Sequence, residues 1–487
     1  MNAFLYTLAM RMASPFLLKL LERRAKKAGG YWDIRGPERF GIYKNSQVAA
    51  SVDDQQVDFE VNAYCFQFRS PVWVHAVSLG ETRASQPLVR LLLDQGYPVL
   101  LTHMTATGRD QGARSFVEDI GAGRLVQAWI PYDLPEAVEG FFAHWKPRCG
   151  LLIEREVWPN LLRGAKKHNV PMILASARFS ESALKQANLL GAVAREAYQS
   201  LDSILAQSQQ DVDRLQELGL NRIEIVGNLK FDVNISMNQV EMGRIAHDHL
   251  QRPIITMAST RDGEENLFIE AILARRRQVE SEAKLEQKAA EAKASKQVVE
   301  VNAHCDAVTV VESNKSNLKK PLYVIVPRHP ERFVEVEALL RKSDLHYVRR
   351  SDNPSDQQLA QTDVLLGDTI GEMFFYYGLS DIAIVAGSFA DFGGQNHIEA
   401  CAVGVPVIVG PHTQNFAKYV EDAIVEGAAR RVRHPIEAII LAHSILDDPE
   451  LLHNMGQAGK QWLALHQGVS QRIYRMIRPL LGNNGAP

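Results

Sequence analysis

The chain has 487 residues, of which 46% are hydrophobic and 23% are charged, and its formal net charge is -3. This length suggests about two or three domains, and the hydrophobic content is sufficient for full cores. The near-neutral charge excludes a global basic field of the kind that would make nucleic acid the main partner. The four cysteines, at positions 65, 149, 305 and 401, show no paired spacing. They fit a reducing compartment and argue against structural zinc.

The N-terminal stretch MNAFLYTLAMRMASPFLLKLLERRAKKAGG is mostly apolar, but Arg11, Pro15 and Lys19 interrupt it and basic residues end it. A clean membrane-spanning helix has about 20 apolar residues with few charges. A cleavable signal peptide carries its charges before the apolar core. The stretch fits neither, so we predict a membrane-associated helix over residues 1–27 whose basic end meets anionic headgroups. An amphipathic helix docked on the protein's own core is the alternative.

Short apolar runs alternate with longer amphipathic runs along the rest of the chain. VWVHAV, YPVLLTHM, RCGLLIE, VPMILAS, SILAQS and IEIVGN predict strands, and a second series comprises PIITMAS, PLYVIVP, DVLLGD, DIAIVAG and VPVIVG. Repeated strand–helix units predict an α/β fold with doubly wound parallel sheets. We expect two Rossmann-like domains, residues 28–235 and 236–487, with a charged insertion of helix and loop at 275–320. His304 and Cys305 in this insertion lack further partners, so no metal site is predicted.

The stretch HAVSLGE lies where the first predicted strand passes into a helix. Ser78 and Glu81 have the S-x-x-E spacing of a capping box, in which each side chain accepts a hydrogen bond from a backbone N–H of the first turn. A carboxylate at the carboxyl end of a strand also lies where α/β folds gather their active sites. The spacing alone leaves both interpretations open.

Polar or glycine-rich turns follow four predicted strands of the second half: PRHPERF, GDTIGEM, GSFADFGGQNHIEA and GPHTQNF. The carboxyl ends of parallel strands bind ligands, and helix N-termini there favour phosphate. Asn396 and Glu399 in isolation read as a capping pair. Four such turns on one sheet edge favour a nucleotide site.

Taken together, these motifs resemble the Kdo transferases of Gram-negative bacteria, lipopolysaccharide inner-core enzymes that move 3-deoxy-D-manno-octulosonic acid (Kdo) from CMP-Kdo onto the lipid A precursor. The sequence departs from the usual pattern of the family at Arg155, Ser176 and His397. Only the insertion and the extreme C-terminus lie outside the resemblance. The matching stretches are, in order, WDIRGPERFGIY, HAVSLGE, MTATGRD, IPYDLPEAVEGFF, IEREVWPN, ASARFSE, GNLKFD, MASTRDGEE, PRHPERF, GDTIGEM and GGQNHIEACAVGVPVIVGPHTQNF.

The resemblance implies a GT-B fold with two domains facing a cleft, and an inverting mechanism that needs neither metal nor cofactor. It implies CMP-Kdo as the donor, lipid IVA as the acceptor, and attachment to the cytoplasmic face of the inner membrane. By resemblance Glu81 is the general base, and Glu156 and Lys230 help to stabilise the transition state. The residues expected to hold CMP are Pro327, Arg328, Ile370, Gly371, Glu372, Met373, Asn396, His397, Ile398 and Glu399.

The chemistry of the donor agrees with these roles. CMP-Kdo carries a single phosphate, whose charge Lys230 and Arg328 would offset without magnesium. Arg83, Arg109 and Arg178 are candidates for binding the donor carboxylate and the acceptor phosphates, or are solvated helix charges. The alternative functions are another GT-B enzyme, a UDP-sugar transferase or epimerase, and a non-catalytic nucleotide-binding protein at the membrane. No feature of the sequence predicts the oligomeric state or the number of Kdo residues added.

Overall fold

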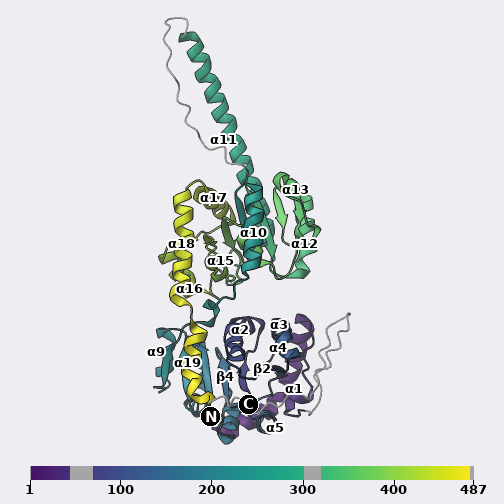
Figure 1. The fold of residues 1–487 in the computed structure, drawn as a ribbon, viewed down its shortest axis with the longest axis vertical. Helices are drawn as coiled ribbons and strands as arrows, with labels where there is room; N and C mark the ends of the chain where they lie inside the picture. The colour runs from purple at the N-terminus through teal and green to yellow at the C-terminus, as the bar shows by residue number, and fades with distance from the viewer. Residues whose placement is uncertain (1, 44–69, 301–319, 483–487) are drawn as a thin grey trace. The chain divides into compact units, whose positions relative to one another are not determined.

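The computed structural model describes residues 2–43, 70–300 and 320–482. The chain divides into two compact units, one made of Met1–Val233 and His466–Pro487 and the other of Asn234–Leu465. Each unit is built on its own seven-stranded parallel sheet covered by helices (Figure 1). The predicted α/β fold with two doubly wound parallel sheets is therefore confirmed.

The sheet of the first unit has the strand order β3-β2-β1-β4-β5-β6-β7. The chain adds strands to one side of β1 and then to the other, so the order reverses between β1 and β4. The edge strand β3 is absent from the predicted set because Gln127 interrupts its apolar run. The strands are β1 (Val72–His75), β2 (Val99–His103), β3 (Leu125–Trp129), β4 (Cys149–Ile153), β5 (Met172–Ala177), β6 (Ser203–Ala206) and β7 (Ile223–Ile225).

Alternating side chains of the first sheet feed two cores, one on each face. Val72 and Val74 of β1 face a core shared with α2 and α19, whereas Trp73 faces a core that contains Phe141 and Phe142 of α5. The helices of this unit are α1 (Ala3–Ala28), η1 (Pro37–Phe40), α2 (Leu79–Asp94), α3 (Ala106–Ser115), α4 (Val117–Gly121), α5 (Pro135–Trp145), α6 (Pro159–Lys167), α7 (Glu181–Leu190), α8 (Ala192–Gln199), α9 (Gln209–Gln216), η3 (Leu229–Phe231) and α19 (Val469–Leu481).

The second unit repeats the plan with the strand order β10-β11-β9-β8-β12-β13-β14. The edge strands β10 and β14 are three residues long and carry arginines, so no apolar run predicted them. The strands are β8 (Ile254–Thr260), β9 (Leu322–Pro327), β10 (Tyr347–Arg349), β11 (Val364–Leu366), β12 (Ile382–Val385), β13 (Val407–Val409) and β14 (Ala429–Arg431). The helices are α10 (Met237–Leu250), α11 (Glu264–Glu300), η4 (Pro330–Arg332), α12 (Phe333–Lys342), η5 (Arg350–Asp352), α13 (Asp356–Gln361), α14 (Met373–Leu379), α15 (Ile398–Val403), α16 (Ala417–Val425), α17 (Pro435–Leu446) and α18 (Pro449–His466).

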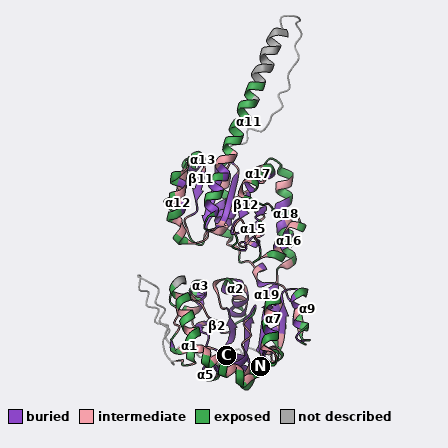
Figure 2. Ribbon diagram, turned by 180° about the vertical axis from the view of Figure 1, so that it is seen from behind, coloured by how far each residue is buried: buried purple, intermediate pink, exposed green. Residues whose placement is uncertain are grey.

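The inner strands of both sheets are buried, whereas α11 becomes exposed as it leaves its core (Figure 2). Phe268 and Ile272 of α11 pack in the core of the second unit, and the side chains from Arg276 to Leu285 are largely solvent-exposed. The predicted charged insertion therefore begins as a continuation of this helix. Its remainder, residues 301–319, which includes His304 and Cys305, lies outside the described residues.

The C-terminal helix α19 belongs to the first unit, which corrects the predicted extent of the second domain, 236–487. Its apolar residues at every fourth position, Val469, Ile473 and Ile477, are buried in the core beside β1. The carboxylate of Asp232 holds the start of this helix. It accepts hydrogen bonds from the backbone N–H groups of residues 468, 469 and 470 at 2.7, 3.1 and 2.5 Å.

We predict that Asp232→Ala lowers the free energy of unfolding by about 1–3 kcal/mol, because three N–H groups lose their acceptor at a helix N-terminus. Urea unfolding followed by circular dichroism measures this change. Asp213→Ala is the control, because Asp213 is exposed on α9, and we expect a change within about 0.5 kcal/mol there. Equal effects of the two substitutions would contradict the prediction.

Candidate active site

Glu81 lies in the first turn of α2, directly after the carboxyl end of β1. The Ser78 hydroxyl oxygen accepts a hydrogen bond from the Glu81 N–H at 3.4 Å, so the predicted cap is present. The Glu81 carboxylate accepts from the Val77 N–H at 2.6 Å, one residue further back than a reciprocal capping box requires. Capping therefore accounts for the position of Glu81 and fixes its carboxylate at this sheet edge.

Two more carboxylates follow the neighbouring strand β4. Val74 of β1 pairs with Leu151 of β4 in a parallel register, so both strands end at the same edge, where the strand order reverses. Glu154 follows the last residue of β4 and is buried. The Glu156 carboxylate accepts a hydrogen bond from the indole N–H of Trp158 at 3.1 Å. Open α/β sheets place their ligand sites at this kind of reversal.

The three carboxyl groups lie close enough to influence one another's ionisation. Burial, together with the negative charges of Glu154 and Glu156, raises the pKa of Glu81 to about 7. Burial also raises the pKa of Glu156, and the charge of Glu154 adds to this effect. A carboxyl with a pKa near the working pH is suited to general acid–base catalysis.

Lys230, in η3, forms an ion pair with Glu154, with its Nζ 3.1 Å from Oε1. Glu154 was not in the predicted catalytic set, although its position directly after a buried strand was a usable signal. The segment that carries Lys230 is held by Ser176, whose hydroxyl oxygen accepts a hydrogen bond from the Leu229 N–H at 3.2 Å. Ser176 has a positive φ of 52° at an irregularity in β5. The departure from the family pattern at Ser176 thus supports the Lys230 segment.

The three arginines considered for binding the donor carboxylate and the acceptor phosphates differ in their contacts. The Arg83 side chain donates a hydrogen bond to Gln111 at 3.1 Å. The Arg178 backbone N–H donates to the Glu154 carbonyl at 3.1 Å, which places Arg178 beside the carboxylates. Arg109 is part of an internal network and is described next.

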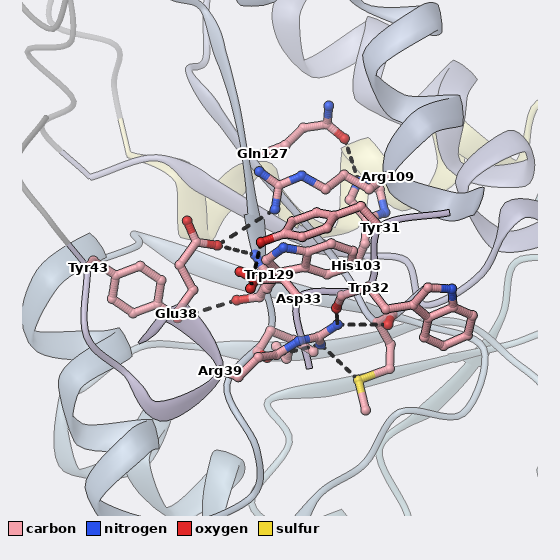
Figure 3. A network of polar contacts seen from close by, with 12 residues as sticks. Tyr31, Trp32, Asp33, Glu38, Arg39, Tyr43, His103, Arg109, Gln127 and Trp129 are labelled. Carbon is pink, nitrogen blue, oxygen red and sulfur yellow. Dashed lines mark hydrogen bonds and ion pairs between the residues drawn. The ribbon is translucent and has the colours of Figure 1, made fainter. Parts of the chain in front are cut away.

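Arg109 lies 3.7 Å from the Glu38 carboxylate, and its guanidinium lies 4.8 Å from the centre of a Trp129 ring (Figure 3). Glu38 also accepts a hydrogen bond from the Trp129 N–H at 2.7 Å. Beneath them Arg39 is buried, 4.2 Å from the Trp129 ring, and donates to the carbonyls of Trp32 and Met104. Burial lowers the pKa of Arg39 to about 10. This network anchors the WDIRGPERFGIY segment to the ends of β2 and β3.

The predicted donor residues of the second unit lie after β9, β11 and β12, at one edge of a parallel sheet. Pro327 ends β9, and the Arg328 side chain donates a hydrogen bond to Gln395 at 3.3 Å, linking the turns after β9 and β12. The Asn396 side chain donates to Glu399 at 3.0 Å and accepts from the Ile398 N–H at 3.1 Å. The contacts of Asn396 and Glu399 with each other and with the start of α15 are therefore those expected of a capping pair.

The side chain of His397 is fully buried and stacks on Trp462 at a ring distance of 5.5 Å. Burial lowers its pKa to about 4. The imidazole is part of the core of the second unit, so only the main chain of His397 fits the predicted nucleotide contact. This agrees with the view that the change from the usual proline preserves a main-chain role.

The segment from Ile370 to Met373 leads into α14, whose first residue is Met373, and Ile370 itself is 66% exposed. Glu372 accepts two hydrogen bonds from the Arg350 guanidinium, each at 3.2 Å, and one from Thr369 at 2.5 Å. Burial opposes ionisation of Glu372, but the Thr369 hydroxyl and the Arg350 charge outweigh it and lower its pKa. These contacts fix the shape of the segment.

Arg261 and Glu264, after the central strand β8, were not predicted as site residues, although their motif MASTRDGEE was noted. The Arg261 guanidinium donates to the imidazole of His329 at 2.6 Å and lies 4.6 Å from the Phe392 ring centre. The buried Glu264 carboxylate accepts from the N–H groups of Arg261, Gly387 and residue 389 at 2.9, 2.7 and 2.9 Å. It thereby ties the turn after β8 to the turn after β12.

Comparison with known proteins identifies relatives over the whole chain. The 3-deoxy-D-manno-octulosonic-acid transferase (kdotransferase) family model matches residues 35–233. A 3-deoxy-D-manno-octulosonic acid transferase from Bordetella pertussis is 44% identical over 482 residues, 99% of this chain and 100% of the relative. Among solved structures, a glycosyltransferase from Rickettsia africae is 13% identical with a TM-score of 0.50, covering 86% of this chain and 100% of that one.

A second solved structure, UDP-GlcNAc 2-epimerase from Neisseria meningitidis bound to UDP-GlcNAc, is 14% identical. Its TM-score is 0.52, and the match covers 85% of this chain and 100% of that chain. At these identities the two structural likenesses concern the fold alone. They support a GT-B arrangement of two doubly wound sheets, and they do not separate transferases from epimerases.

We predict that the Glu81 carboxyl titrates with a pKa of about 7 and that Glu156→Gln moves this midpoint to lower pH, because one repelling charge is removed. The chemical shift of the Glu81 side-chain carboxyl carbon, followed by NMR across pH 4–9, reports both values. Glu196→Gln is the control, because Glu196 is an exposed partner of Arg163. An unchanged midpoint in Glu156→Gln would refute the coupling.

Proposed function

The chain belongs to the 3-deoxy-D-manno-octulosonic acid (Kdo) transferase family, and we propose that it transfers Kdo from CMP-Kdo to lipid IVA in lipopolysaccharide core biosynthesis, releasing CMP. Family membership establishes a glycosyltransferase; the donor and acceptor are part of the proposal. The observation that carries the proposed mechanism is the environment of Glu81. A half-buried carboxylate with a pKa of about 7 lies in the first turn of the helix that follows β1, beside two more carboxylates.

In the proposed reaction Glu81 takes the proton of an acceptor sugar hydroxyl. The hydroxyl oxygen forms a bond to the anomeric carbon of Kdo, while the bond from that carbon to the CMP phosphate oxygen breaks. The electron pair of that bond leaves with CMP, and the configuration at the carbon inverts. The hydroxyl has a high pKa, so a positioned base that accepts its proton as the new bond forms contributes roughly 10²–10⁴ in rate.

Glu156 and Lys230 are proposed to support this step by charge. Glu156 keeps the proton affinity of Glu81 high, because its negative charge disfavours a second anion. Lys230 offsets the charge of Glu154 through their ion pair. We propose that Lys230 also provides positive charge for the transition state, as the family resemblance implies.

The proposed donor site lies at the carboxyl edge of the second sheet. Arg328 and Arg261, after the adjacent strands β9 and β8, supply the positive charge for one phosphate and the Kdo carboxylate. We propose that the main chain near His397 and the side chains of Asn396 and Glu399 hold the nucleoside. Two arginines match the charge of a monophosphate donor, so we propose that transfer requires neither metal nor cofactor. Added EDTA should therefore leave the rate unchanged.

Helix α1 is proposed to attach the protein to the cytoplasmic face of the inner membrane. Within the described residues, Ala3–Lys26 is the helix long and apolar enough to cross a membrane, and none of its apolar window is buried. Large apolar side chains are exposed along one side, including Phe4, Met12 and Phe16, each more than 70% exposed. Exposed basic residues follow them near the helix end. An apolar stripe ending in basic charge fits a helix lying in the interface of an anionic membrane.

A UDP-sugar transferase or epimerase remains the competing assignment, because the fold is shared with such enzymes. The whole-length relatedness to a Kdo transferase favours Kdo over a UDP-sugar. Incubation with lipid IVA and either CMP-Kdo or UDP-GlcNAc, followed by mass spectrometry of the lipid, separates these functions. We expect Kdo addition from CMP-Kdo, and sugar transfer or epimerisation from UDP-GlcNAc alone would overturn the proposal.

Glu81→Gln should lower kcat by roughly 10²–10⁴ with CMP-Kdo and lipid IVA, because the amide keeps a hydrogen-bond acceptor for the helix cap but takes up no proton. In the wild type the base must be ionised. We therefore expect kcat to fall about tenfold per pH unit below a midpoint of about 7. Glu181→Gln, at an exposed position of α7, is the control. Full activity in Glu81→Gln would exclude Glu81 as the base.

Arg261→Met should reduce kcat/KM for CMP-Kdo by roughly 10- to 100-fold, because a charged hydrogen bond to the donor is lost. Arg341→Met removes an exposed arginine from the same unit and serves as the control. Initial rates at varied CMP-Kdo with saturating lipid IVA measure the effect. An unchanged kcat/KM in Arg261→Met would remove this arginine from the donor site.

A further inference from the structure

Two consecutive polar side chains of helix α1 contact buried residues of the first unit, in addition to the more exposed ion pairs of Arg11 with Glu136 and of Glu22 with Arg35. The Tyr6 hydroxyl donates a hydrogen bond to the Asp133 carboxylate at 2.7 Å. The Thr7 hydroxyl donates to the side-chain oxygen of Asn160 at 3.1 Å. Asp133 and Asn160 are both nearly fully buried, at 5% and 4% exposure. We call Tyr6, Thr7, Asp133 and Asn160 the α1 anchor.

The buried half of the anchor also holds the start of α6. The Asp133 carboxylate accepts hydrogen bonds from the backbone N–H groups of Asn160 and Leu161 at 3.2 and 2.7 Å. The Asn160 side chain donates to the Asp133 carbonyl at 2.8 Å. Trp158, at the N-cap position of α6, makes no side-chain capping bond. Asp133 therefore serves as the capping carboxylate of α6, where the helix dipole favours a negative charge.

The segment that carries Glu154 and Glu156 connects β4 to the start of α6, which Asp133 caps. β4 ends at Ile153 and α6 begins at Pro159, so Glu154 and Glu156 lie on the short connection between them. The Glu156 carboxylate is bonded to Trp158, the last residue before α6. A shift of the α6 start is therefore transmitted to Glu156 through a short, fixed connection.

We propose that Tyr6 and Thr7 are positioning residues for the transferase reaction: through Asp133 and Asn160, the membrane-facing helix fixes the segment that carries Glu154 and Glu156. Attachment of α1 and the geometry of the acidic site are thus coupled in the first unit. The inference rests on the proposed function, because it concerns the rate of Kdo transfer.

The face of α1 that carries the anchor is distinct from its exposed apolar stripe, so the two roles of the helix can be separated. Removing the hydroxyls of Tyr6 and Thr7 leaves Phe4, Met12 and Phe16 unchanged. Phe and Val retain nearly the original shapes of Tyr and Thr. Ser14→Ala is a matched control, because among the described residues the Ser14 hydroxyl donates a hydrogen bond within its own helix, to the Arg11 carbonyl.

The test compares wild type, the Tyr6→Phe/Thr7→Val double variant and Ser14→Ala in three measurements. The first is binding to vesicles of phosphatidylethanolamine and phosphatidylglycerol. The second is kcat with CMP-Kdo and lipid IVA, on vesicles and in detergent micelles. The third is the pH at which kcat is half-maximal on the acid side.

We expect the double variant to bind vesicles as wild type does. Its kcat should fall roughly tenfold both on vesicles and in detergent, which is less than the ~100-fold loss of rate that a 1 Å misplacement of a catalytic group can cause. Its acid midpoint should move to lower pH, because a loosened segment holds its charges less closely to Glu81. Ser14→Ala should match wild type in every measurement.

An unchanged kcat with an unchanged pH midpoint overturns the proposal. A deficit on vesicles that disappears in detergent also overturns it, since the anchor would then serve membrane attachment alone. Wild type that transfers no Kdo to lipid IVA under any condition refutes the proposed function instead. Thermal unfolding of each variant identifies a loss of fold, and in that case the single variants Tyr6→Phe and Thr7→Val provide the same comparison.

Discussion

Carboxylates that lie close together in a partly buried site repel one another, and the candidate site of the first unit depends on how this repulsion is balanced. The parallel pairing of β1 and β4 brings the residues after each strand to one edge, so Glu81, Glu154 and Glu156 share it. The ion pair with Lys230 offsets one charge. Burial and the remaining charges hold the pKa of Glu81 near neutrality. A carboxyl in this state takes and releases a proton near neutral pH, as general acid–base catalysis requires.

Mutually repelling carboxylates stay close together only if contacts with other residues fix the backbone segments that carry them. Each segment of the site has its own support. Asp133 caps the helix that follows Glu156, and Ser176 binds the turn that carries Lys230. Asp232, two residues after Lys230, binds the start of the C-terminal helix. The return of α19 to the first unit therefore does more than fill the core beside β1, because it also fixes the chain next to the only lysine of the predicted catalytic set.

The sequence was sufficient where structure follows from local pattern. Continuous apolar runs predicted the central strands, and the S-x-x-E spacing predicted the Ser78 cap. The local sequence pattern was insufficient where contacts between residues far apart in the chain determine the structure. The apolar stripe of α19 indicates that this helix is buried, but it does not indicate in which unit. Strand β3 was not predicted, because Gln127 interrupts its apolar run. The Glu154–Lys230 pair joins residues far apart in the chain, so the motifs supplied its members but not their contact. His397 could be placed in a motif, whereas its stacking on Trp462 depends on a helix near the end of the second unit.

The proposed donor site in the second unit has the opposite electrostatic requirement, since an anionic donor needs positive charge that internal carboxylates do not neutralise. Glu264 is buried beside Arg261, yet its oxygens are occupied by three backbone N–H groups. Glu265 instead pairs with Arg332, with an N–O distance of 3.0 Å. The side-chain partners of Arg261 are the imidazole of His329 and the ring of Phe392. Burial and the neighbouring arginines lower the pKa of His329, which keeps it neutral. Buried carboxylates therefore organise the backbone of this edge, while Arg261 is oriented by neutral groups, as the proposed donor site requires.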